Sequence, residues 1–246
     1  MSIFLVGGGP DTTTTPVIFD QFVAEVVHRT GKGRPPRIAV ALVDHEGSAE
    51  YFLPAYLEPL QRRLPCDVVP VLLRRGERVD PRMFDGVDAV VVGGGPTPVY
   101  AEGLRPAGAA IRQAVQAGVP YLGFSAGAMI AAEQAIVGGY LVRGAEVCPE
   151  DASEGLGELE LREGLGLVPF AIDVHAAQAG TLGRAVAAVV HGMAGKAVAV
   201  DENTALVLPH LDPGEQRAIG TGNCWLIRGP GPRAAVSILG SLVTGG

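Results

Sequence analysis

The chain has 246 residues, of which 48% are hydrophobic and 18% charged, and its formal net charge is −7 at pH 7. This composition is typical of a globular protein, and the length suits one α/β domain with a large core. The acidic balance argues against a nucleic-acid partner, which requires a basic surface. No apolar stretch reaches the roughly 20 residues of a membrane helix, and the first residues lack the basic region of a signal peptide. We therefore expect a cytoplasmic protein.

Short apolar runs rich in β-branched residues alternate with helix-like runs along the first half of the chain. We expect strands at residues 2–6, 37–43, 66–73, 87–95 and 119–125, and a helix from about Leu104 to Ala117. The apolar runs are continuous rather than alternating, which is typical of strands buried on both faces. The sequence therefore predicts an α/β fold with a doubly wound, mostly parallel sheet flanked by helices.

The second half of the chain departs from this rhythm. Acidic residues predominate between 137 and 168, which we interpret as hairpin and loop, either a flap over a site or a solvated acidic insertion. Strands are expected again at 170–175 and 196–202, and the runs TALVLP, CWLIR and AAVSIL predict short C-terminal edge strands. The sequence contains no repeat or long linker, so residues 1–246 are expected to form a single domain.

Glycines follow two of the expected strands, at Gly7–Gly9 and at Gly93–Gly95. Their spacing completes neither the dinucleotide-binding pattern G-x-G-x-x-G nor a P-loop, although glycine at a strand end also permits any close backbone approach. The three cysteines are far apart and form no C-x-x-C pair, which argues against a zinc site and a disulfide framework. We expect no metal and no organic cofactor.

The stretch YLGFSAGAM places Ser125 in Gly-x-Ser-x-Gly, between an expected strand and an alanine-rich helix. A nucleophile on such a sharp turn needs small neighbours, here Gly123 and Gly127, and the helix N–H groups that follow can stabilise an oxyanion. The alternative interpretation is a small serine that caps the helix.

A serine nucleophile needs a base, and the base needs an orienting carboxylate. Of the five histidines, His175 is the first choice because it ends the strand 170–175, at the edge of the sheet where Ser125 lies. His45, after the strand 37–43, is the alternative. Asp201 and Glu202 close the strand 196–202, and one of them should reach the imidazole N–H, unless the two residues simply form a turn.

Four runs occur in the order VVGGGPTPVY, YLGFSAGAM, IDVHAAQAGTLGR and VAVDENTALVL. Together they resemble the serine peptidase family of aspartyl dipeptidase (peptidase E) and cyanophycinase, which has a class I glutamine-amidotransferase-like fold. The resemblance spans roughly residues 1–210. It implies Ser125 as the nucleophile, His175 as the base and Glu202 as the orienting acid. The positions that match the family's oxyanion hole are Gly94, Gly95 and Ala126.

The order Ser–His–Glu along the chain fits this family and differs from that of α/β-hydrolases, in which the acid precedes the histidine. The substrate pocket matches the family less well than the catalytic residues do. Cyanophycinases carry an arginine-rich run after the catalytic histidine, whereas this chain has Ala179 and Thr181 at two of those positions and keeps only Arg184. Peptidase E has an asparagine where this chain has Pro96. Arg184, Asp173 and Pro96 are our candidates for contacts with the substrate.

The sequence thus predicts a serine peptidase or amidase that cleaves a short peptide or isopeptide and is not an efficient cyanophycinase. Two alternatives stay open: an inactive homologue that binds a ligand, and an enzyme that passes the acyl group to an acceptor other than water. The expected partner is the small substrate, with a homodimer as one option, and neither nucleic acid nor membrane is expected.

Overall fold

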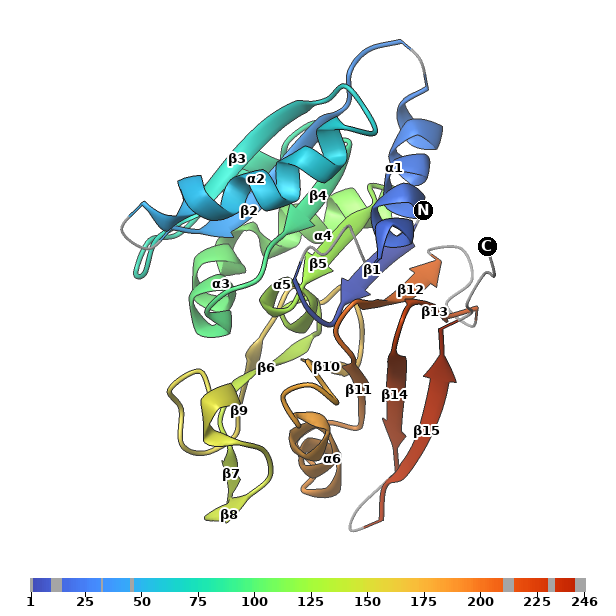
Figure 1. Ribbon diagram of the computed structural model, residues 1–246. Coiled ribbons are helices and arrows are strands. Elements are labelled where there is room, and N and C mark those ends of the chain that lie inside the picture. The colour runs from blue at the N-terminus through green and yellow to red at the C-terminus, as the bar shows by residue number, and fades with distance from the viewer. Residues whose placement is uncertain are drawn as a thin grey trace.

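A seven-stranded sheet forms the upper half of the computed structural model in Figure 1, which describes residues 2–9, 15–31, 33–44, 47–209, 215–229 and 233–241. Its strands, in spatial order, are β13 (Arg217–Gly220), β12 (Thr204–Pro209), β1 (Ser2–Val6), β5 (Tyr121–Phe124), β4 (Ala89–Val92), β2 (Arg37–Val43) and β3 (Asp67–Leu73). The five strands from β1 to β3 run parallel, whereas β12 and β13 join antiparallel at one edge. The prediction of a mostly parallel sheet is confirmed.

Helices cover both faces of this sheet. These helices are α1 (Pro16–Thr30), α2 (Ser48–Gln61), α3 (Thr97–Leu104), α4 (Gly108–Gln116) and α5 (Ala126–Met129). Helix α6 (Leu182–Val190) lies in the lower half of the molecule in Figure 1, and the 3₁₀ turns are η1 (Pro81–Phe84), η2 (Arg105–Ala107) and η3 (Glu150–Ala152). The predicted single helix 104–117 is wrong at its start, because Pro106 lies in η2 and separates α3 from α4. Among the described helices, none combines the length and the apolar character that a membrane span requires.

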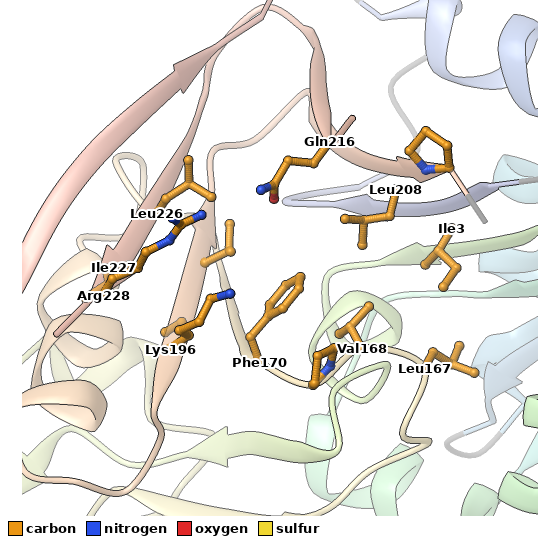
Figure 2. Close-up of a pocket in the computed structure, with 14 residues that line it drawn as sticks. Ile3, Leu167, Val168, Phe170, Lys196, Leu208, Gln216, Leu226, Ile227 and Arg228 are labelled. Atoms are coloured by element: carbon orange, nitrogen blue, oxygen red, sulfur yellow. The ribbon is translucent and has the colours of Figure 1, made fainter. Parts of the chain in front are cut away.

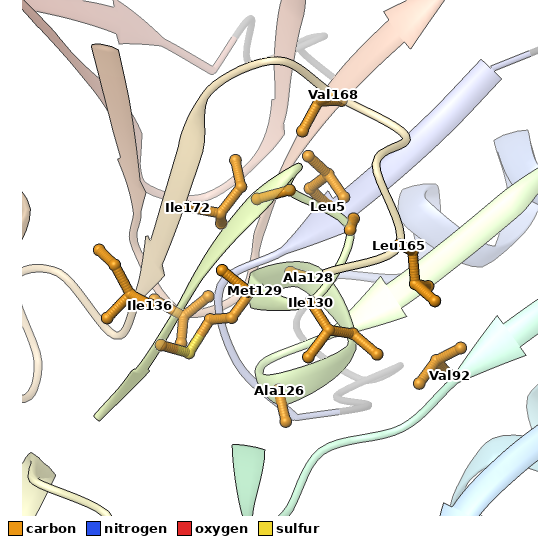
Figure 3. Close-up of a cluster of buried hydrophobic side chains, with 14 of the residues drawn as sticks. Leu5, Val92, Ala126, Ala128, Met129, Ile130, Ile136, Leu165, Val168 and Ile172 are labelled. Atoms are coloured by element: carbon orange, nitrogen blue, oxygen red, sulfur yellow. The ribbon is translucent and has the colours of Figure 1, made fainter. Parts of the chain in front are cut away.

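Two apolar clusters occupy the two faces of the sheet. Phe4, Phe22 and Phe124 belong to the cluster under α1 and α2. On the opposite face, Figure 3 shows Leu5 and Met129 close to Ile172, so that side chains from the sheet, from α5 and from the lower half of the molecule share one core. Every residue of β1, β4 and β5 is buried, which explains why these strands have continuous apolar sequences.

A second sheet of four strands lies below the first in Figure 1 and includes the strand that leads to His175. It contains β10 (Ala171–Val174), β11 (Lys196–Val200), β14 (Asn223–Arg228) and β15 (Ala235–Gly240). The prediction that the strand before His175 belongs to the same sheet as the strand before Ser125 is therefore wrong. A continuous apolar run shows that a strand is buried, but it carries no information on which strand it pairs with.

The acidic segment 137–168 forms short paired strands, which lie below the main sheet in Figure 1. β6 (Gln134–Gly138) pairs with β9 (Glu160–Glu163), and β7 (Leu141–Val142) forms a hairpin with β8 (Ala145–Glu146). Glu154 accepts a 2.9 Å hydrogen bond from the Thr97 hydroxyl at the start of α3. The hairpin-and-loop interpretation agrees with these elements, and the Glu154 contact ties the segment to α3.

Candidate active site

Ser125 lies on a sharp turn between β5 and α5, at the carboxyl edge of the parallel strands. Its φ is +49°, a backbone conformation that non-glycine residues rarely adopt. A Cβ at Gly123 would collide with the Gly127 carbonyl, and a Cβ at Gly127 would collide with the Val92 carbonyl. The glycines on either side of Ser125 are therefore required for the turn, and the half-buried serine stays accessible.

Ser125, His175 and Glu202 form one hydrogen-bonded series. The Ser125 Oγ lies 2.9 Å from Nε2 of His175, and Nδ1 of the same ring lies 2.7 Å from Oε1 of Glu202. The His175 side chain is 30% exposed and that of Glu202 is 42% exposed, so the series is open to solvent. This arrangement can move the serine proton to the imidazole while the carboxylate holds the ring.

The carboxyl end of β1 brings the two sheets together at this point. The Val6 carbonyl accepts a hydrogen bond from the Ser125 N–H, and the Gly7 carbonyl accepts one from the His175 N–H, both at 2.9 Å. Gly8 leaves little room for a side chain, because a Cβ there would lie 3.2 Å from Cε1 of the His175 ring. Sequence reasoning did not place Gly7 and Gly8 in the site, although a glycine run at the end of a strand was the available signal.

Asp201 and Glu202 point in different directions. Asp201 is buried and accepts hydrogen bonds from the Trp225 indole, the Ala177 N–H and the Asn223 N–H, at 2.9, 3.1 and 2.9 Å. Its carboxylate therefore joins β11, β14 and the turn after His175, and of the two acids only Glu202 is bonded to the imidazole. The Glu202 N–H donates to the Gln178 side chain, a contact that no sequence motif indicated.

The three expected oxyanion-hole positions differ in whether their N–H groups are available. Gly94 N–H donates to the Tyr56 hydroxyl at 2.9 Å, so this donor is occupied. Among the described residues, no acceptor bonds the N–H of Gly95 or of Ala126. Burial raises the pKa of Tyr56, although the Gly94 N–H acts in the opposite direction, so the hydroxyl is protonated at neutral pH. Sequence reasoning missed Tyr56, which lies in α2 and in no motif.

The expected substrate contacts of Arg184 and Asp173 need correction. Arg184 is 2% exposed and Asp173 is fully buried. The guanidinium donates two hydrogen bonds to the Asp173 carboxylate, at 2.8 and 2.7 Å, and reaches the Ala152 and Gly139 carbonyls of the acidic segment. Burial alone would lower the pKa of Arg184, but the Asp173 charge outweighs it and raises the pKa above the ordinary value. The pair therefore joins β10, α6 and the segment 137–168 and offers no surface to a substrate.

The remaining candidates are placed as follows. Pro96 is exposed at the start of α3, next to Gly95, and stays available for a substrate contact. The alternative base His45 lies outside the described residues. Within the described ranges, no group of three acidic, histidine or cysteine side chains could hold a metal ion.

Comparison with known families identifies the family of the chain. The profile of peptidase family S51 matches residues 56–211, which is more than half of the sequence. The chain belongs to peptidase family S51. The resemblance to the peptidase E and cyanophycinase family is thereby confirmed. The matched range includes Ser125, His175 and Glu202. No curated protein matches the chain significantly.

Two solved structures share the fold of this S51 member. A peptidase from an acI-B1 actinobacterium superposes with a TM-score of 0.67 at 17% identity, and the match covers 96% of each chain. A protein from Listeria monocytogenes EGD-e assigned as a peptidase E superposes with a TM-score of 0.52 at 14% identity, over 89% of this chain and 98% of that one. At these identities the likeness extends to the fold alone.

Proposed function

We propose that this S51 member is a serine hydrolase that cleaves a short peptide or isopeptide through an acyl-enzyme on Ser125. The observation that carries the proposal is the series Ser125 Oγ, His175 Nε2 and Nδ1, and Glu202 Oε1, joined at 2.9 and 2.7 Å. The strained φ of Ser125 supports it, since such strain recurs at nucleophiles on strand-to-helix turns.

In the proposed reaction, the Ser125 oxygen attacks the scissile carbonyl carbon while its proton passes to Nε2 of His175. Glu202 keeps the other imidazole proton on Nδ1 and stabilises the positive ring. His175 then returns the proton to the leaving amine, the C–N bond breaks, and the acyl group remains on Ser125. Water, deprotonated by His175, hydrolyses the ester and restores the serine.

The negative oxygen of the tetrahedral intermediate requires donors, and in the part of the chain that the structure describes no acceptor bonds the N–H groups of Ala126 and Gly95. Ala126 N–H begins α5, and Gly95 N–H follows the β4 strand. Removal of one such donor costs about 10²–10³ in rate in comparable enzymes. In this proposal Gly94 contributes indirectly, because its N–H is bonded to Tyr56.

The substrate is proposed to be small and not a cyanophycin chain. Binding a polymer dense in carboxylates and guanidiniums requires several charged contacts, each worth about 1.5–3 kcal/mol. Ala179 and Thr181 supply none, and the Thr181 hydroxyl donates to the Val174 carbonyl within the protein. Arg184 is engaged by Asp173. The arginine-rich run of cyanophycinases thus has no accessible counterpart after His175.

The test is a hydrolysis screen of purified protein against neutral and acidic dipeptides, isoaspartyl dipeptides and insoluble cyanophycin, with Ser125→Ala as the matched control. We expect cleavage of at least one small substrate by the wild type and none by the variant. Rapid Ser125-dependent release of β-aspartyl-arginine from cyanophycin would overturn the proposed substrate class. Equal turnover by both proteins would overturn the proposed nucleophile.

One observation favours a second candidate, an inactive homologue that binds a ligand at the same place. The bond between Gly94 N–H and Tyr56 removes one of the three expected oxyanion donors. An inactive homologue would bind members of the same library without cleaving them. Calorimetry on the uncleaved compounds therefore separates the two candidates.

A further inference from the structure

A cavity of about 340 Å³ lies between the two sheets, away from Ser125. Figure 2 shows Ile3 and Leu208 of the first sheet facing Phe170 and the strands of the second sheet across this space. Phe170 precedes β10 and His175 follows it, so five residues of extended chain, about 16 Å, separate the cavity from the candidate active site. The cavity is thus a separate feature at the opposite end of β10.

Two cations lie directly opposite each other at this cavity. Lys196 of β11 pairs in register with Arg228 of β14, and both side chains line the cavity. Both residues are exposed, and within the described ranges neither has an ion-pair or hydrogen-bond partner for its side chain. Like charges opposite each other on neighbouring strands are destabilising, and an anion between them would relieve the repulsion.

Apolar side chains continue inward from the cations on the same face of the second sheet. Val198 pairs with Leu226, two residues further along each strand, and side chains two apart in a strand share a face. Both line the cavity, and Ile3 and Leu208 of the first sheet line it as well. In Figure 2 the Lys196 and Arg228 side chains lie on one side of the space and Leu208 and Ile3 on the other. The cavity therefore has a charged end and an apolar end.

We propose that this cavity binds a small amphiphilic carboxylate. The carboxylate lies between Lys196 and Arg228, where it accepts charge-assisted hydrogen bonds, and the apolar body occupies the space between the sheets. The volume is at the lower end of the range for small-molecule pockets, which fits one ligand of the size of a medium-chain fatty acid. The proposal is independent of the reaction at Ser125.

Isothermal titration calorimetry with decanoate tests the proposal, and decanol is the matched neutral ligand. We expect saturable binding of one decanoate per chain, at least about tenfold tighter than decanol, because decanol lacks the charge that the two cations recognise. Decanoate should also raise the thermal unfolding midpoint of the wild type. Absence of saturable decanoate binding, or equal affinity for decanol, would overturn the proposal.

Arg228→Gln removes one cation and should weaken decanoate binding about tenfold or more without weakening decanol binding. Arg75→Gln, at an exposed arginine outside the cavity, removes the same charge and should leave both affinities unchanged. Without ligand, Arg228→Gln should not lower the unfolding midpoint, since the repulsion from Lys196 is gone. If Arg228→Gln does not fold, Lys196→Gln replaces it. If Arg228→Gln and Arg75→Gln weaken decanoate binding equally, decanoate responds only to the net charge of the protein and the proposal is overturned.

Discussion

The buried pair of Asp173 and Arg184 gives a quantitative prediction about how β10 and α6 are held to the acidic segment 137–168. Arg184→Met leaves the Asp173 carboxylate buried without its countercharge, and Asp173→Leu leaves the guanidinium buried in the same way. Breaking a buried pair from one side costs about 3–5 kcal/mol. That is a large share of the 5–15 kcal/mol by which domains are ordinarily stable, so each single variant should lose much of its stability.

The double variant should be far more stable than the sum of the singles predicts. It buries no unpaired charge, and its main loss is the hydrogen bonds from Arg184 to the Ala152 and Gly139 carbonyls, about 1–3 kcal/mol. A coupling free energy of about 3 kcal/mol or more should result. Urea unfolding followed by the fluorescence of Trp225, the single tryptophan, measures all four proteins. Additive losses would refute the inference that the pair is a buried, mutually dependent contact.

Three further predictions concern the site and the thiols. Glu202→Gln should lower kcat by a factor on the order of 10³–10⁴ with little change in stability, whereas Asp201→Asn should mainly lower stability. Steady-state kinetics and urea unfolding measure both effects, and a larger loss of kcat in Asp201→Asn than in Glu202→Gln would contradict this assignment. Tyr56→Phe should lower kcat about tenfold, because without the hydroxyl the Gly94 N–H loses its acceptor and the adjacent Gly95 N–H is held less firmly. A rise in kcat would mean that the hydroxyl instead occupies an N–H group that the oxyanion needs. In the native protein at pH 7, Cys224 should not react with iodoacetamide, because burial raises the pKa of that thiol to about 12. Peptide mass spectrometry measures the alkylation, and a native protein alkylated at Cys224 would contradict the burial of this residue.

The sequence identifies the parallel core of the fold because the physical signal there is local. Strands buried on both faces, such as β4 and β5, must be apolar along their whole length, and this shows in the sequence. The pairing of β10 with β11 in a separate sheet is not local. It depends on which strands meet in space, and residues 170–175 have the same apolar character in either sheet.

The candidate site likewise has features that the sequence predicts and features that depend on tertiary contacts. His175 and Glu202 approach Ser125 because each of the three residues follows the carboxyl end of a strand and these ends converge. The motifs that contain the three residues can be recognised in the sequence. The Tyr56 contact depends on how α2 lies over the sheet, and no residue near Tyr56 indicates it. For Arg184 the sequence shows a charged residue on a helix, but its burial depends on the acidic segment that covers it, and that covering is a tertiary contact.

In the proposed function, Ser125 is an activated nucleophile. The most direct measurement is the intact mass of the protein after treatment with a fluorophosphonate probe, with the modified residue located by peptide mass spectrometry. We expect one adduct per chain, on Ser125, formed rapidly by the wild type, slowly by Glu202→Gln and not at all by Ser125→Ala. A wild-type protein that stays unlabelled while correctly folded, or an adduct on another residue, would contradict it.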